Sequence, residues 1–178
     1  METNCVGKLI QQKKETKKSL SKKYSFSNQK PLLGIFLDKE LSKDVESKVH
    51  VFLEASQELD IEVVVLADSN LDSLHLPNVI YLPYNRTNRQ TLLGAADMAL
   101  IFGFSDVEEM LLNGVIPISS LRPEVSDYNP NRETGNGFIF KKESPWAIFA
   151  ALVRARETFK FPYDWKHIIR QGMSSIKS

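Results

Sequence analysis

Residues 95–118 read AADMALIFGFSDVEEMLLNGVIPI, and this stretch decides the fold class. Two short apolar runs, residues 98–102 and 115–118, flank a segment of helical character at residues 106–113. Short apolar runs bounded by turn residues are typical of strands that are covered on both faces of a parallel sheet. Gly114 stands where the end of a helix favours a residue that can adopt positive φ. The stretch therefore predicts a strand–helix–strand unit.

The rest of the chain continues this alternation. Apolar or β-branched runs predict further strands at residues 32–37, 61–67, 79–82 and 137–140. Helical spacing of apolar residues predicts helices at 7–24, after the N-cap Ser42, after the N-cap Thr87, and at 146–159 and 163–173. Strands that alternate with helices indicate the α/β class. We therefore expect a single Rossmann-like, doubly wound parallel sheet of about six strands, flanked by helices.

The composition suits one globular domain. The chain has 178 residues, of which 42% are apolar and 25% charged. No apolar run approaches the roughly 20 residues that span a bilayer, and no apolar leader is visible, so the expected location is the cytoplasm. The single cysteine, Cys5, excludes an internal disulfide, and its place near the N-terminus argues against a catalytic thiol.

Charge divides the chain into two expected parts. Residues 1–30 hold eight Lys and two Glu, a net charge of +6, whereas residues 31–178 carry a net charge of −5. We expect a basic, partly helical N-terminal extension followed by the Rossmann-like domain. The extension is either a solvated segment or a tether for nucleic acid or an anionic surface. Its aromatic residues, Tyr24 and Phe26, are too few to favour binding of nucleic acid bases.

Motifs that carry chemistry are scarce. The sequence contains neither the GxGxxG fingerprint nor a phosphate-binding GxxxxGK[ST] loop. His50, His75 and His167 lack the spacing of metal ligands. Ser105 lacks the flanking glycines of a nucleophile elbow. The residues alone predict no catalytic residue, no metal site and no cofactor.

Short matches in a fixed order link the chain to a known family. They lie at residues 96–97, 114–118, Asp127, 134–140, Ala150, Ala155, Trp165 and Met173. In this order they resemble the C-terminal domain of bacterial glycogen and starch synthases, which are B-type glycosyltransferases that transfer glucose from a sugar nucleotide to a glucan. Residues 7–36 are similar to the segment in which that domain begins.

The resemblance implies a donor site that this chain has altered. Family members follow the first strand with RLxxQKG, whose Arg and Lys hold the donor diphosphate; Asp38 takes the place of the Arg, and only Lys43 remains. The family's EPCGL loop, whose Glu contacts the donor sugar, is missing between residues 102 and 110. The family's TGG is replaced by Arg122–Pro123–Glu124, where proline lacks an amide and glutamate repels phosphate.

We therefore expect a glycogen/starch synthase-like domain that is not an enzyme by itself and acts as a binding or interaction module. The alternative is a donor-binding half of a hexosyltransferase that takes ADP-glucose or UDP-glucose and works with a separate acceptor-domain protein. Expected partners are a sugar nucleotide, a glucan or a second copy of the chain. A nucleotide-sugar pocket at the strand ends would be lined by Asp38, Lys43, Asp68, Tyr84, Ser105 and Arg122.

Overall fold

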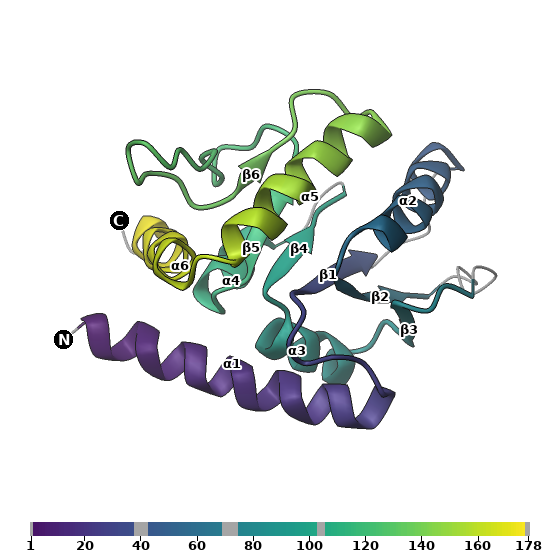
Figure 1. Ribbon diagram of the computed structural model, residues 1–178, viewed down its shortest axis with the longest axis horizontal. Helices are drawn as coiled ribbons and strands as arrows, with labels where there is room; N and C mark the ends of the chain where they lie inside the picture. The colour runs from purple at the N-terminus through teal and green to yellow at the C-terminus, as the bar shows by residue number, and fades with distance from the viewer. Residues whose placement is uncertain (1, 38–42, 69–74, 103–105, 177–178) are drawn as a thin grey trace.

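The computed structural model describes residues 2–37, 43–68, 75–102 and 106–176. Its strands are β1 (Leu32–Leu37), β2 (Glu62–Ala67), β3 (Val79–Pro83), β4 (Met98–Leu100), β5 (Ile116–Ser119) and β6 (Phe138–Ile139). They form one parallel sheet in the order β3-β2-β1-β4-β5-β6 (Figure 1). The order reverses between β1 and β4, which is the switch point of a doubly wound sheet. The predicted fold class is confirmed.

Helices cover the sheet on both faces. They are α1 (Glu2–Tyr24), α2 (Lys43–Ala55), α3 (Arg86–Ala95), α4 (Val107–Leu112), α5 (Pro145–Phe159) and α6 (Pro162–Ile176), with a short 3-10 helix, η1, at Ser56–Glu58. Successive side chains of β1 point to opposite faces of the sheet, as in any strand. Leu33, Ile35 and Leu37 join a core built mainly with α2, α5 and α6. Leu32 and Phe36 join a second core built mainly with α3 and α4.

Helix α1 is packed on this body. It runs along α3, and the N-terminal part of α1 contacts α6 (Figure 1). Its Val6 and Leu20 are buried, one in each core. The helix begins at Glu2 instead of residue 7. The division of the chain at residue 30 stays a prediction.

The ends of the helices agree with the sequence in most places. Gly114 adopts φ of 64° after α4, as predicted, and Ser144 caps α5. The predicted cap of α3 is wrong: Asn85, not Thr87, accepts a hydrogen bond from the backbone N–H of Asn88 at 2.8 Å, and the helix starts at Arg86. An asparagine oxygen satisfies the exposed N–H of a first turn as well as a threonine hydroxyl does. The predicted cap Ser42 lies outside the described residues.

The long polar segment between β5 and β6 is folded onto itself. Asn136 is buried, and its side chain accepts a hydrogen bond from the backbone N–H of Ser126 at 2.8 Å and donates one to the carbonyl of Glu124 at 3.0 Å. Gly135, at φ of 109°, makes the adjoining turn. The segment therefore holds Glu124 and its neighbours in place beyond β5.

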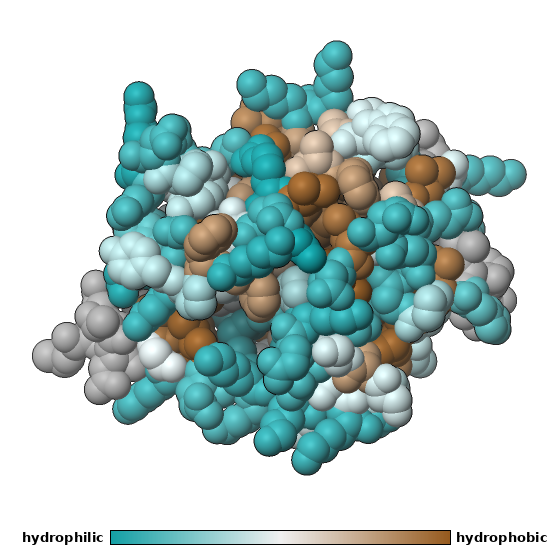
Figure 2. All heavy atoms as spheres, in the orientation of Figure 1, coloured by the Kyte–Doolittle hydropathy of each residue, from teal (hydrophilic) through white to brown (hydrophobic). Residues whose placement is uncertain are grey.

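Surface hydropathy shows where apolar residues gather. On the face drawn in Figure 2, hydrophobic side chains collect in the middle, and hydrophilic ones surround them. Large exposed side chains include Trp146 and Tyr163, at the starts of α5 and α6. None of the helices in the described part of the chain is long and apolar enough to cross a membrane.

Candidate functional site

The carboxyl ends of the strands meet at one edge of the sheet, because all six strands are parallel. We call this the carboxyl edge; its described residues are 43–48, 68, 84–89, 106–109, 119–124 and 141–146, which begin α2, α3, α4 and α5 or follow β2 and β5. In doubly wound sheets, ligands bind at this edge, at the switch point. The donor site implied by the family resemblance was expected at this edge.

The predicted site residues are spread along this edge. Lys43, the first residue of α2, is exposed, and so is Asp68 after β2. Tyr84 is half-buried after β3, next to β2, and packs against the second core. Arg122 is half-buried after β5, across the switch point from the other three residues and 4.0 Å from the carboxylate of Glu124. Asp38 and Ser105 lie outside the described residues.

An ion pair that the sequence did not predict joins α3 to α4. The guanidinium of Arg89 bonds to the carboxylate of Glu109. This hydrogen bond raises the pKa of Arg89 above its usual value, and Tyr84 contributes in the same direction. The two residues are 20 positions apart, so only the fold brings the first turns of the two helices together. One cation of the carboxyl edge is therefore already neutralised.

The N-terminus of α4 is occupied by carboxylates. The side chain of Asp106 accepts a hydrogen bond from the backbone N–H of Glu109 at 3.0 Å. Glu108 and Glu109 stand in the first turn of the helix. Acidic groups complement the positive end of the helix dipole. A phosphate placed here would meet negative charge and would find one N–H already bonded.

Other cations of the carboxyl edge also face carboxylates. Lys48 lies 3.6 Å from the carboxylate of Glu143, and Arg122 lies near Glu124. Among the described residues, no group of three or more His, Cys, Asp and Glu could hold a metal ion. The described part of this edge has a balanced charge and does not form a basic phosphate cradle.

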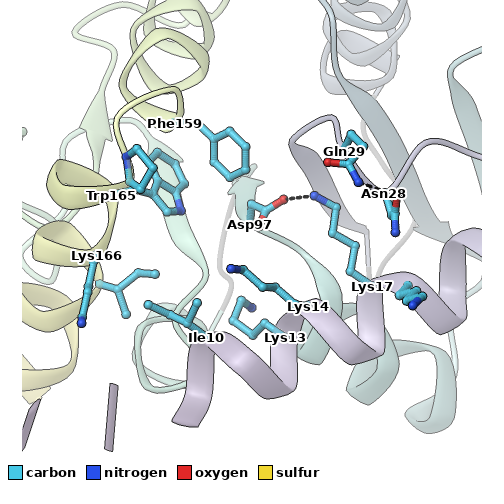
Figure 3. A pocket seen from close by; sticks show the side chains of 13 residues that line it. Ile10, Lys13, Lys14, Lys17, Asn28, Gln29, Asp97, Phe159, Trp165 and Lys166 are labelled. Carbon is cyan, nitrogen blue, oxygen red and sulfur yellow. Dashed lines mark hydrogen bonds and ion pairs between the residues drawn. The ribbon is translucent and has the colours of Figure 1, made fainter. Parts of the chain in front are cut away.

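A second hollow lies at the opposite edge of the sheet, where β1 and β4 begin. This amino-edge pocket has a volume of about 590 Å³ and is enclosed by α1, the segment before β1, Asp97 and α6 (Figure 3). Five lysines line it: Lys13, Lys14, Lys17, Lys18 and Lys166. Asp97 is the single carboxylate among its lining residues. The pocket is therefore basic.

Two of these lysines are buried. Lys17 donates to the carboxylate of Asp97 at 2.6 Å and to the carbonyl of Lys30 at 2.6 Å. Lys13 donates to the carbonyl of Leu93 at 3.1 Å. Burial lowers the pKa of Lys13 to about 8; the nearby Lys17 ammonium also lowers it, whereas Asp97 raises it.

The amino-edge pocket was not predicted, because residues 1–30 were expected to form a solvated segment or a tether and not a wall of the domain. A signal was present in the spacing. Val6, Ile10, Leu20 and Tyr24 recur at intervals of four and ten residues, which places them along one stripe of a helix. Lys13 and Lys17 fill the gap in this stripe. Lysines in the apolar stripe of a helix are buried when the helix packs.

Two comparisons in sequence connect the chain to glycogen synthases. The glycogen synthase of Gloeobacter violaceus is 32% identical over 103 residues, which are 53% of this chain and 22% of that enzyme. Glycogen synthase 1 of Synechocystis is 39% identical over 64 residues, 34% of this chain and 13% of that enzyme. The match thus spans about a fifth of these relatives or less. No protein-family model matches the sequence.

Solved structures share the fold. The C-terminal domain of a glycosyl transferase group 1 family protein (LpcC) from Francisella tularensis has a TM-score of 0.57 at 13% identity, covering 84% of this chain and 87% of that one. WaaG, a glycosyltransferase involved in lipopolysaccharide biosynthesis, has a TM-score of 0.60 at 14% identity, with coverage of 89% and 46%. The UDP-GlcNAc 2-epimerase of Neisseria meningitidis, bound to UDP-GlcNAc, has a TM-score of 0.54 at 12% identity, with coverage of 90% and 46%.

Likeness at these structural identities shows the fold alone. The sequence matches agree with the resemblance to glycogen and starch synthases. The chain is therefore similar in sequence to part of the bacterial glycogen synthases, and it shares its fold with the C-terminal domain of a glycosyl transferase group 1 family protein.

Proposed function

We propose that this chain transfers no glucose by itself and acts as a binding module built on a glycosyltransferase domain. The proposal concerns the carboxyl edge, where a sugar-nucleotide donor would have to bind. A cytoplasmic location, as expected from the sequence, is part of the proposal.

The observation that carries the proposal is the cluster of carboxylates at the N-terminus of α4. Asp106 caps this helix, and Glu108 and Glu109 follow it. Transfer from a sugar nucleotide builds negative charge on the departing diphosphate, and enzymes stabilise such charge with preorganised donors or cations. A carboxylate at the end of the helix raises the energy of that charge. This repulsion disfavours glucose transfer by the chain.

The remaining charges support the same proposal. The guanidinium of Arg89 is paired with Glu109, and Arg122 has Glu124 beside it. Arg89, which already holds the carboxylate of Glu109, must give up that bond before it can hold phosphate. The replacement of the family's arginine by Asp38, read from the sequence, acts in the same direction.

One observation favours a second candidate, the donor-binding half of a glucosyltransferase. Lys43 is exposed at the start of α2, on the carboxyl edge, and its ammonium can reach a ligand. A neighbour of the same fold is bound to UDP-GlcNAc. This candidate requires saturable binding of ADP-glucose or UDP-glucose that depends on Lys43.

Titration of the labelled protein with both sugar nucleotides, followed by amide chemical shifts, separates the candidates. We expect no saturable shifts at the carboxyl edge at millimolar ligand. Saturable shifts around residues 43–48 that Lys43→Ala removes would establish the second candidate and contradict the first. Lys22→Ala, an exposed lysine of α1, is the matched control, because it removes the same charge far from this edge.

A further inference from the structure

We propose that the amino-edge pocket binds a small phosphorylated ligand whose phosphate lies among the lysines of α1 and whose ring packs against Phe159 and Trp165. This site lies at the edge of the sheet opposite to the donor position of the family. It is independent of the proposed function, which concerns the carboxyl edge alone.

Charge is the first argument. Five lysines line the pocket, and Asp97 is the one lining carboxylate. That carboxylate is already bound by the ammonium of Lys17 and by the backbone N–H of Leu32 at 2.8 Å. Lys13 is 6% exposed and has a carbonyl, not a carboxylate, as its hydrogen-bond acceptor. The pocket therefore holds an excess of positive charge, part of it buried, that a multivalent anion would compensate.

The low pKa of Lys13 has burial as its main cause. Its pKa of about 8 results from burial and from the ammonium of Lys17, against the opposing effect of Asp97. A buried ammonium loses hydration and needs a partner of opposite charge. A phosphate dianion beside it would supply that charge and would stabilise the protonated form of Lys13 on binding.

The apolar wall is the second argument. The apolar lining residues from α5 and α6 are Phe159, Pro162, Trp165 and Ile169, and Ile10 adds an apolar side chain on α1 beside the lysines. Phe159 and Trp165 pack edge to face, with ring centroids 5.1 Å apart. In Figure 3 the side chains of Lys14 and Lys17 reach from α1 toward Asp97 and the aromatic residues. A ligand with both a phosphate and a ring, such as a nucleotide, would satisfy both walls.

Shape favours a small molecule over a nucleic acid chain. The pocket is enclosed by elements on several sides, and its volume of about 590 Å³ lies in the range typical of small-molecule sites. Two of the basic groups, Lys13 and Lys17, are buried within it. A nucleic acid backbone is bound instead by a groove that follows the strand, with aromatic residues for successive bases.

The test uses three probes: AMP, which has both a phosphate and a ring; pyrophosphate, which has no ring; and a short single-stranded oligonucleotide. Each is titrated into the full chain by calorimetry and by amide chemical shifts. We expect saturable binding of AMP, with shifts at α1, Asp97 and α6 and none at the carboxyl edge. Pyrophosphate should bind at the same residues more weakly.

Three variants complete the test. Lys14→Gln changes an exposed side chain and should fold; it should weaken AMP binding by about tenfold, which is the loss of one strong charged contact. Phe159→Leu should weaken AMP binding more than pyrophosphate binding, because only AMP uses the ring surface, although the variant also removes the ring over which the Lys17 ammonium lies. Lys22→Gln, outside the pocket on the same helix, should leave both unchanged.

Three results would overturn the proposal. The first is the absence of saturable shifts with AMP and pyrophosphate at millimolar concentration. The second is equal weakening by Lys14→Gln and Lys22→Gln, which would indicate general attraction to a basic helix. The third is tight oligonucleotide binding that AMP does not displace, which would assign this face to nucleic acid.

Discussion

The ion pair of Lys17 and Asp97 should be a main tie between α1 and the rest of the domain. The two side chains are 8% and 15% exposed, and their charged atoms are 2.6 Å apart. In Asp97→Asn the side chain keeps an oxygen that can accept the 2.8 Å bond from the N–H of Leu32, but the carboxylate charge is lost. Lys17 then remains buried with the carbonyl of Lys30 and the face of the Phe159 ring as its partners.

Breaking one side of a buried pair typically costs 3–5 kcal/mol because the other charge stays buried without its counter-ion. Since this pair is not fully enclosed, we expect Asp97→Asn to lower the free energy of unfolding by about 3 kcal/mol. Urea denaturation followed by circular dichroism measures this value. Replacing both partners, in Lys17→Met with Asp97→Asn, should recover part of the loss, because no unpaired charge remains.

The control is Asp60→Asn, which removes the carboxylate 3.1 Å from Lys30 in an exposed pair. Exposed pairs contribute little to stability because water and salt screen them. The free energy of unfolding should therefore stay close to that of the unaltered chain. Equal effects of Asp97→Asn and Asp60→Asn would contradict the reasoning and would mean that α1 is not held by the buried charge.

Three further predictions follow from the same structure. The pKa of Lys13 is about 8 in the folded chain and about 10.5 in the unfolded chain, so between these pH values the unfolded chain binds more protons. The free energy of unfolding should therefore rise from pH 8 to 10.5 by up to about 3 kcal/mol. Urea denaturation of Lys13→Met should show a flatter rise. Gly135→Ala should lower the melting temperature by several degrees, because Gly135 has a φ of 109° and a Cβ there would lie 2.5 Å from the carbonyl oxygen of Asp127. Gly7→Ala is the control: Gly7 lies in open space on α1, and the substitution should raise the melting temperature slightly. Light scattering should give twice the 20.3 kDa chain mass, because large side chains such as Trp146 are exposed; a monomer at high concentration would contradict this.

The sheet could be predicted from the sequence because its strands are short apolar runs with turn residues at both ends. The runs at residues 32–37 and 79–82 became β1 and β3 almost unchanged. Helix ends were less certain, as at α3, because several neighbouring residues can accept the same hydrogen bond.

The two buried or half-buried ion pairs could not be predicted, because each joins distant positions of the chain. Lys17 and Asp97 are 80 residues apart, and Arg89 and Glu109 are 20 apart. Such pairs depend on which strand lies beside which, and a run of apolar residues carries no information on that order. The replacements in the expected donor site were visible only through resemblance to a family, because an aspartate or a glutamate in a polar stretch of sequence predicts no site by itself.

Glucose transfer by the domain alone tests the central claim most directly. The purified chain is incubated with labelled ADP-glucose or UDP-glucose and a glycogen primer, and label in the polymer is counted beside an active glycogen synthase. The account predicts no incorporation above that of a sample without protein. Steady incorporation that Lys43→Ala abolishes and Lys22→Ala leaves unchanged would contradict it and would make this chain a transferase.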